Sequence, residues 1–192
     1  MENNRIILFG GSFDPIHNGH KSSVDVLRKE FPDSTILILP SINKLKDKSL
    51  IPLEERIASV KSVFHSYSNV NVLDWSLHWD TSSTFKVVSY IKKSYPNGSV
   101  YVAAGEDIIS SLPKWKYYRK VVKNINWIFF LRNSGVFLSE NVNPEIQEMI
   151  NCSVLLKTPC LKISSTLIKQ SPKNHINDIP REARPIVLKY LK

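Results

Sequence analysis

The chain has 192 residues, of which 42% are hydrophobic and 22% charged, and this balance is typical of a folded globular protein. Its longest apolar runs are about five residues against the roughly 20 that a membrane helix needs, and two cysteines, Cys152 and Cys160, are too few for a disulfide framework or a zinc ribbon. The net charge is +9, but the lysines are spread along the chain, so we expect small polyanionic substrates in preference to nucleic acid as the main partner.

The chain starts without a basic-then-apolar leader pattern. Together with the scarcity of cysteine, this start favours a cytoplasmic protein whose two thiols are reduced. No internal repeat, low-complexity tract or linker divides the sequence. We therefore expect one domain over residues 1–192 and no membrane partner.

Short apolar segments alternate with stretches of helical periodicity, which predicts an α/β protein with a parallel sheet. Strands are expected at Arg5–Phe9, Thr35–Leu39, Val70–Leu73, Val100–Ala104 and Trp127–Leu131, with a late one near Ser153–Leu156. Helices are expected from Asn18 or Gly19 onward, along the apolar positions from Leu53 to Tyr67, over Thr84–Tyr95, and from about Arg181 to Leu191. The expected fold is a doubly wound, mainly parallel sheet of roughly five to six strands, flanked by helices and ending in a helical C-terminal part.

The most informative motif, Gly10–His20, directly follows the first expected strand. Gly10 and Gly11 let backbone N–H groups approach an anion without an intervening Cβ, and the N-terminus of the next helix adds its own N–H groups. His20 shares the inward stripe of that helix with three apolar residues, so it should point to the sheet edge where α/β proteins bind ligands. With His17 one turn earlier, the motif predicts a phosphate-binding site.

Two other interpretations of this motif are a zinc-binding pair of histidines and a purely structural turn built on Asp14 and Pro15. A third histidine, cysteine or carboxylate does not follow at a recognisable ligand spacing, which argues against zinc. The glycine patterns of ordinary dinucleotide-binding folds and of P-loop ATPases are both missing from the sequence.

Several polar segments follow the expected strands and should gather at the carboxyl edge of the sheet. Pro40–Ile51 is rich in lysine, Gly105-Glu106-Asp107 follows the fourth strand, and Arg132-Asn133-Ser134-Gly135 follows the fifth. Each of them taken alone is most simply a solvated loop. Their convergence at one edge is what a ligand site requires.

A second motif starts a late helix at residues 163–169. Ser164 can cap this helix, and Ser165 and Thr166 offer hydroxyl and free N–H groups. Lys169 lies one turn further on, where its ammonium group can reach an anion held at the helix start. In isolation the same residues would be a capped helix with a surface lysine. Paired with the first motif, they favour a second set of phosphate-binding groups.

The Gly-Gly-Ser-Phe-Asp-Pro-x-His-x-Gly-His run of residues 10–20 and the Ile-Ser-Ser-Thr-x-Ile-Lys run of residues 163–169 resemble the nucleotidyltransferase superfamily with the (H/T)-x-G-H signature. Within it, the chain is most similar to the bacterial nicotinate-nucleotide adenylyltransferases. That likeness also covers Ser83-Thr84-Phe85, Gly105-Glu106-Asp107, Leu112-Pro113-Lys114-Trp115 and Arg132-x-x-Gly135. It implies a single Rossmann-like domain that joins ATP to nicotinate mononucleotide, with Mg²⁺ bound to the ATP phosphates. A homo-oligomer is compatible with this family.

The resemblance also implies roles for individual residues. His17, His20 and Lys169 would be the catalytic groups, stabilising the charge that grows on the attacked phosphate. ATP would be bound by these groups and by Gly10, Gly11, Ser12, Phe13, Gly105, Asp107, Ile163, Ser164 and Ser165. The mononucleotide would be bound by Ser41, Lys46, Thr84, Trp115 and Arg132, with Trp115 stacking on the pyridine ring. None of these residues is expected to bind a metal directly.

The chain departs from the family pattern at four places: Ser41 replaces the usual Asn, Asn43–Lys46 replaces a Pro-Pro-His-Lys loop, Ser83 replaces Tyr, and Lys169 replaces Arg. Lysine keeps the charge of arginine but loses its two-pronged hydrogen bonding. Transfer to nicotinamide mononucleotide or to phosphopantetheine therefore stays an alternative. A non-catalytic nucleotide- or nucleic-acid-binding protein with the same fold is the alternative of a different class.

Overall fold

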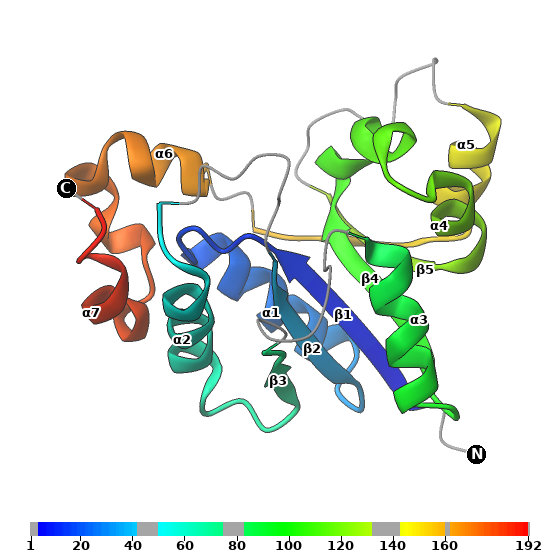
Figure 1. Cartoon of the computed structure of the whole chain (residues 1–192), viewed down its shortest axis with the longest axis horizontal. Coiled ribbons are helices and arrows are strands. Elements are labelled where there is room, and N and C mark those ends of the chain that lie inside the picture. Colours follow the sequence, from blue (N-terminus) through cyan, green and yellow to red (C-terminus); the bar gives the residue numbers. More distant parts are fainter. Residues whose placement is uncertain (1–3, 42–49, 75–82, 132–142, 160–161, 192) are drawn as a thin grey trace.

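The structure, a computed structural model, describes residues 4–41, 50–74, 83–131, 143–159 and 162–191. Within these ranges six parallel strands form one sheet in the order β3-β2-β1-β4-β5-β6 (Figure 1). They are β1 (Arg5–Gly11), β2 (Thr35–Pro40), β3 (Val70–Val72), β4 (Ser99–Gly105), β5 (Asn126–Leu131) and β6 (Val154–Lys157). The parallel sheet expected from the sequence is confirmed, and each strand overlaps its predicted segment.

Helices of two kinds surround the sheet. The α-helices are α1 (Asn18–Glu30), α2 (Leu53–Phe64), α3 (Thr84–Ser94), α4 (Tyr118–Asn124), α5 (Pro144–Asn151), α6 (Ser165–Gln170) and α7 (Arg184–Val187). The 3₁₀ helices are η1 (Glu106–Lys114), η3 (Pro172–Asp178) and η4 (Arg181–Ala183). The sequence predicted α1, α2 and α3 to within a few residues, whereas η1, α4, α5 and η3 were not predicted.

Side chains of β1 alternate between two hydrophobic layers, as the two-residue period of a strand requires. Ile7 and Phe9 belong to a cluster with α1, α2 and α6, whereas Ile6 and Leu8 belong to a cluster with α3, α4 and α5. Both faces of the sheet are therefore covered, which explains why the strands read as nearly continuous apolar runs. The arrangement is Rossmann-like.

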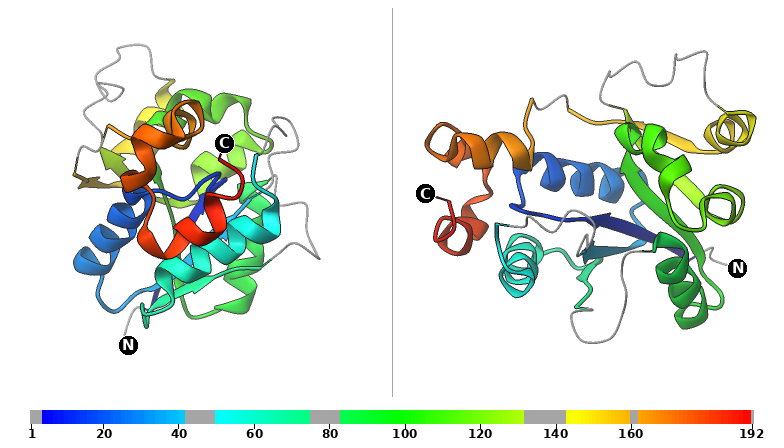
Figure 2. Two further views of the ribbon diagram at one scale, coloured as in Figure 1. Left: turned by 90° about the vertical axis from the view of Figure 1, so that its left-hand side faces the viewer. Right: turned by 45° about the horizontal axis from the view of Figure 1, so that its top comes forward.

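The predicted helix from about Arg181 to Leu191 is wrong as a single element. The structure has the 3₁₀ turn η4, then the four-residue helix α7, and then turns. Pro185 lies at the start of α7 and has no backbone N–H to donate to the carbonyl four residues earlier, at Arg181. The C-terminal part is helical, as expected, but it is divided at this proline. It packs beside α2 (Figures 1 and 2).

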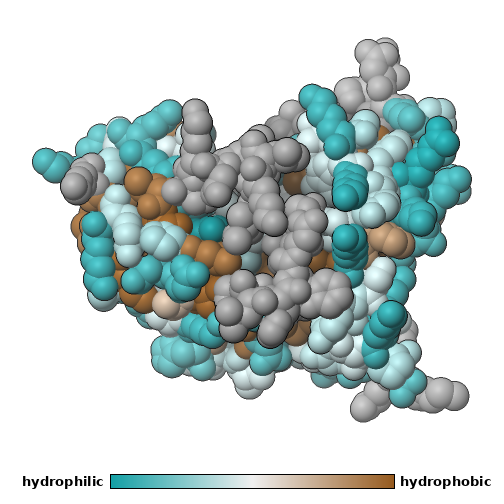
Figure 3. Space-filling model, viewed as in Figure 1, coloured by the Kyte–Doolittle hydropathy of each residue, from teal (hydrophilic) through white to brown (hydrophobic). Residues whose placement is uncertain are grey.

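Among the described residues, no helix is both long enough and apolar enough to cross a membrane. On the face drawn in Figure 3, hydrophilic side chains cover α3 and α4, and apolar ones reach the surface near α2 and α7. The apolar surface is thus beside the divided C-terminal part.

The strand order places the first sequence motif at a special position in the sheet. Gly10 and Gly11 pair with Leu39 and Pro40 of β2, while β4 lies on the other side of β1. Connections to the two sides of β1 run in opposite directions across the sheet, and ligands of such folds bind outside the strand ends at this reversal. The fold therefore puts the Gly10–His20 motif where a ligand site is expected.

Candidate active site

The glycine turn at the end of β1 leaves room next to the strand. An added Cβ on Gly10 would meet no atom within 4 Å, so this backbone faces open space. A Cβ on Gly11 would lie 3.2 Å from the ring of Phe13, which is fully buried and has a φ of 48°. The left-handed backbone conformation of Phe13 is unusual for a bulky residue, and it sets the direction of the chain in the turn after β1.

His17 and His20 face one another at the first turn of α1. His17 is the N-cap residue, and its ring stacks on that of His20 with a centroid distance of 3.7 Å. The backbone N–H of His17 donates to Nδ1 of His20 at 3.2 Å. Neutral His20 consequently carries its proton on Nε2, which is then a hydrogen-bond donor. The ring of Phe13 also packs against His20, with a centroid distance of 4.8 Å.

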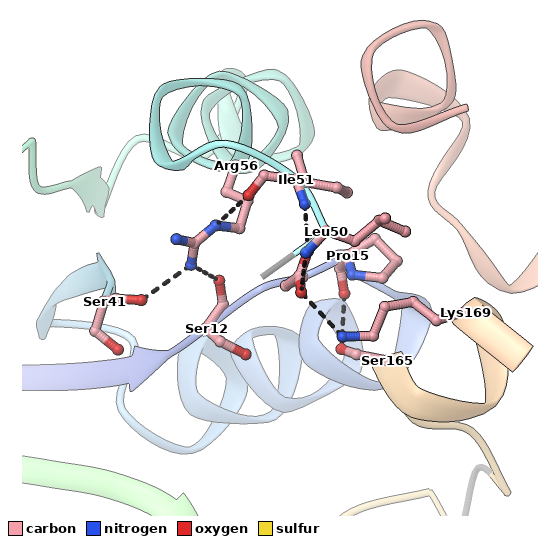
Figure 4. Close-up of polar contacts among 9 residues, drawn as sticks. Ser12, Pro15, Ser41, Leu50, Ile51, Arg56, Ser165 and Lys169 are labelled. Carbon is pink, nitrogen blue, oxygen red and sulfur yellow. Dashed lines mark hydrogen bonds and ion pairs between the residues drawn. The ribbon is translucent and has the colours of Figure 1, made fainter. Parts of the chain in front are cut away.

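The second motif lies against the first, although about 150 residues separate them (Figure 4). Ser164 caps α6 by accepting the N–H of Leu167 at 3.2 Å, and Ser165 Oγ donates to the Pro15 carbonyl at 2.9 Å. Nζ of Lys169 lies 2.9 Å from Oδ2 of Asp14. The Ser165 hydroxyl and the Lys169 ammonium group therefore adjoin the turn that leads to the two histidines.

Ile163, just before this second helix start, packs at the same place. Its Cγ2 atom would lie 3.3 Å from an added Cβ on Gly19, the second residue of α1. The two helix starts therefore lie close together at this glycine. A larger residue at this position would require neighbouring side chains to shift.

Arg56 is a buried residue of this site that the sequence analysis missed. Only 2% of it is exposed, and its guanidinium group donates to the carbonyls of Ile51, Ser12 and Ser41 (Figure 4). It therefore links α2 to the ends of β1 and β2. The sequence feature that could have revealed it is the position of this charged residue, three residues after Leu53 on the apolar side of a predicted helix.

Replacing this arginine should destabilise the fold. Arg56→Met keeps the length of the side chain but leaves three backbone carbonyls without their donor, so we expect a loss on the order of 3 kcal/mol. Urea unfolding measures it. Arg119→Met, at an exposed arginine of α4, is the control and should change stability by less than about 0.5 kcal/mol. An equal, small effect of both substitutions would contradict this role of Arg56.

The residues predicted to bind the ribose and the pyridine ring lie at the end of β4, in and after η1, and at the start of α3. Gly105 ends β4 and Asp107 is exposed in η1. Thr84 begins α3, and Trp115 follows η1 with its indole N–H donating to Ser111 Oγ at 3.2 Å. The rings of the adjoining residues Phe85 and Tyr117 are 5.8 Å apart, so the segments bearing Thr84 and Trp115 are close.

The remaining candidates for mononucleotide binding have different outcomes. The N–H and hydroxyl of Ser41 both donate to the carbonyl of Gly11, at 2.9 and 3.2 Å. Ser41 therefore has a structural contact with the glycine turn, and its substrate contact stays a prediction. Lys46 and Arg132 lie outside the described residues.

Comparison with known proteins identifies the family of the chain. Residues 8–171 match the family model described as cytidylyltransferase-like. The chain belongs to this nucleotidyltransferase family. It is 31% identical over 169 residues to the "probable nicotinate-nucleotide adenylyltransferase" of Thermotoga petrophila, covering 87% of this chain and 85% of that one. It is 25% identical to the protein of the same name from Thermosipho melanesiensis, covering 87% and 84%.

A solved structure shows the same fold. The nicotinic acid mononucleotide adenylyltransferase of Plasmodium falciparum, complexed with NaAD, superimposes with a TM-score of 0.76 over 97% of this chain and 96% of that one. The sequence identity is 23%, so this likeness concerns the fold. The Rossmann-like prediction is thereby confirmed.

Proposed function

We propose that the protein transfers the adenylyl group of ATP to the phosphate of nicotinate mononucleotide, releasing pyrophosphate and forming nicotinate adenine dinucleotide for NAD biosynthesis. The observation that carries this proposal is the meeting of the two motifs, with Lys169 and Ser165 against the turn that bears His17 and His20. The named relatives support the choice of nicotinate mononucleotide as the acceptor.

The reaction needs little acid–base chemistry from the protein. The phosphate of the mononucleotide is already ionised at neutral pH and attacks the α-phosphorus of ATP in line, without a covalent intermediate. The enzyme must orient the two nucleotides and stabilise the charge that grows on the phosphoryl oxygens. The Nε2–H of His20, the His17 ring and the ammonium group of Lys169 are donors suited to that task.

The surrounding residues divide between the two nucleotides in this proposal. Gly10, Gly11, Ser12, Phe13, Ile163, Ser164 and Ser165 would follow the triphosphate, and Gly105 and Asp107 would bind the ribose of ATP. The open space beside Gly10 supports the first assignment because a phosphate can approach the backbone there. Ser41, Thr84 and Trp115, together with Lys46 and Arg132, would bind the mononucleotide.

Nucleotidyltransferases use a divalent metal with ATP, and we propose Mg²⁺ here. Within the described ranges no three His, Cys, Asp or Glu side chains come together as a metal site. The carboxylate of Asp14 is already engaged by three donors. These residues fit an ion that is held mainly by phosphate oxygens, as Mg²⁺ is in many nucleotide sites. When bound, the ion would neutralise charge on the phosphates.

Pyrophosphate release tests the proposed function. The protein is incubated with Mg-ATP and, in separate reactions, nicotinate mononucleotide, nicotinamide mononucleotide or phosphopantetheine, with a reaction lacking acceptor as the control. We expect the highest kcat/KM with nicotinate mononucleotide. A higher value with either other acceptor would contradict the substrate assignment. Release with none of them would contradict the catalytic function itself.

A further inference from the structure

The Asp14 carboxylate lies where three segments of the chain meet. Only 3% of Asp14 is exposed, and its two oxygens accept from the backbone N–H groups of Leu50 and Ile51, at 3.1 and 2.9 Å, and from Nζ of Lys169, at 2.9 Å (Figure 4). The turn after β1, the entry to α2 and helix α6 are thus tied to one side chain. A buried carboxylate is stabilised by such a set of donors.

Lys169 is less buried than its partner. Its side chain is 30% exposed, against 4% for that of Asp14, so the ammonium group sits at the border of the site. An ammonium group has three protons, and the contact with Asp14 uses one of them. Among the described residues Asp14 is the hydrogen-bond partner of Lys169, so two protons can be donated to phosphate oxygens. Asp14 can therefore fix the position of Lys169 without removing it from the reaction.

A second chain of hydrogen bonds connects the Asp14 carboxylate to the turn after β1. Ile51, whose N–H donates to Asp14, accepts with its carbonyl from Nε of Arg56 at 3.0 Å. Arg56 in turn donates to the carbonyl of Ser12, two residues before Asp14. The contacts form a closed ring around the turn. They hold the carboxylate in place relative to the backbone that would bind the triphosphate.

We propose that Asp14 is a positioning residue for adenylyl transfer, which acts by orienting Lys169 and does not itself touch the nucleotides. This inference rests on the proposed function of the same site. A buried negative charge close to a triphosphate would weaken ATP binding, whereas its ion pair with Lys169 would place the ammonium group for the transition state.

The substitution Asp14→Asn separates the effect of the charge on ATP binding from its effect on the position of Lys169. The amide removes the negative charge and keeps one acceptor oxygen in place of two, so the ion pair with Lys169 is lost while part of the hydrogen bonding can remain. We expect kcat to fall by about tenfold or more while KM for ATP stays unchanged or decreases. A role confined to stability would leave kcat per folded molecule unchanged.

A double-mutant cycle with Lys169→Met gives the decisive test. If Asp14 acts through Lys169, the Asp14→Asn/Lys169→Met protein should have the kcat of Lys169→Met alone, to within about twofold. Multiplication of the two single effects would overturn the inference. Wild-type activity with nicotinate mononucleotide is measured first. Absence of that activity would contradict the proposed function, whereas additive effects in an active enzyme would contradict the role of Asp14.

Further variants guard against unfolding. Asp14→Glu keeps the charge and should recover part of the kcat lost in Asp14→Asn. If the asparagine variant does not fold, the cycle is run with Asp14→Glu, and the same non-additivity is expected.

Asp25→Asn breaks the partly exposed ion pair of Asp25 with Lys21 on α1 and is the matched control. It should leave kcat unchanged. Equal loss in Asp25→Asn and Asp14→Asn would also overturn the inference.

Discussion

His20→Ala should lower kcat by about a hundredfold or more, which corresponds to roughly 3 kcal/mol of transition-state stabilisation. The reason is that Nδ1 of His20 accepts the N–H of His17, so Nε2 is the proton-bearing atom and can donate to the phosphoryl oxygens. KM for ATP should change much less, because other groups of both motifs would still bind the phosphates. Steady-state kinetics with nicotinate mononucleotide gives both quantities.

Two further histidine variants make this expectation specific. His20→Gln places an amide NH₂ near the position of Nε2 and should recover part of the activity that alanine loses. His65→Ala removes an exposed ring at the end of α2 and should have no effect on kcat. Near-normal turnover in His20→Ala would show that the catalytic role is misassigned. An increase in KM for ATP with unchanged kcat would show that His20 only binds the substrate.

Local patterns were sufficient to predict the sheet and the place of the two motifs. The strands are buried on both faces, so they read as apolar runs, and the glycines after β1 mark the turn that follows. The helices α4 and α5 are seven and eight residues long, and such short segments carry little periodicity. The prediction of one continuous helix over Arg181–Leu191 was wrong because it gave more weight to the apolar residues of this segment than to Pro185.

The contacts that organise the site could not be predicted from local patterns. Asp14 read as a turn residue because its partner Lys169 is 155 positions away, and no local spacing reports such a contact. Arg56 lay on the inner side of a helix among apolar residues, where its three carbonyl partners come from three different segments. Motif recognition named the groups that face the ligand, whereas the groups that hold them emerged only from the fold.

Gly19→Ala should impair catalysis although alanine is the better helix former. Within a helix, alanine is favoured over glycine by about 1 kcal/mol, so a substitution at the second position of α1 would ordinarily be neutral or stabilising. Here an added Cβ would lie 2.9 Å from both Cε1 and Nδ1 of His17 and 3.3 Å from Cγ2 of Ile163. These contacts are too close, so the imidazole of His17 must move.

The His17 ring cannot move alone. It is only 4% exposed and stacks at 3.7 Å on His20, so its displacement shifts the second ring as well. We therefore expect kcat to fall by about tenfold or more, with little change in the melting temperature. Kinetics and thermal unfolding of the same preparation measure both.

Gly98→Ala is the matched control for this glycine. A Cβ there would also lie 2.9 Å from a side-chain atom, Cγ1 of Ile6, but it lies next to the amino ends of β1 and β4, opposite the candidate site. That variant should lose stability and keep its turnover per folded molecule. Because the same steric conflict then has different consequences at the two places, the pair separates packing from catalysis. Full turnover in Gly19→Ala would mean that the placement of the His17 ring does not matter for the reaction.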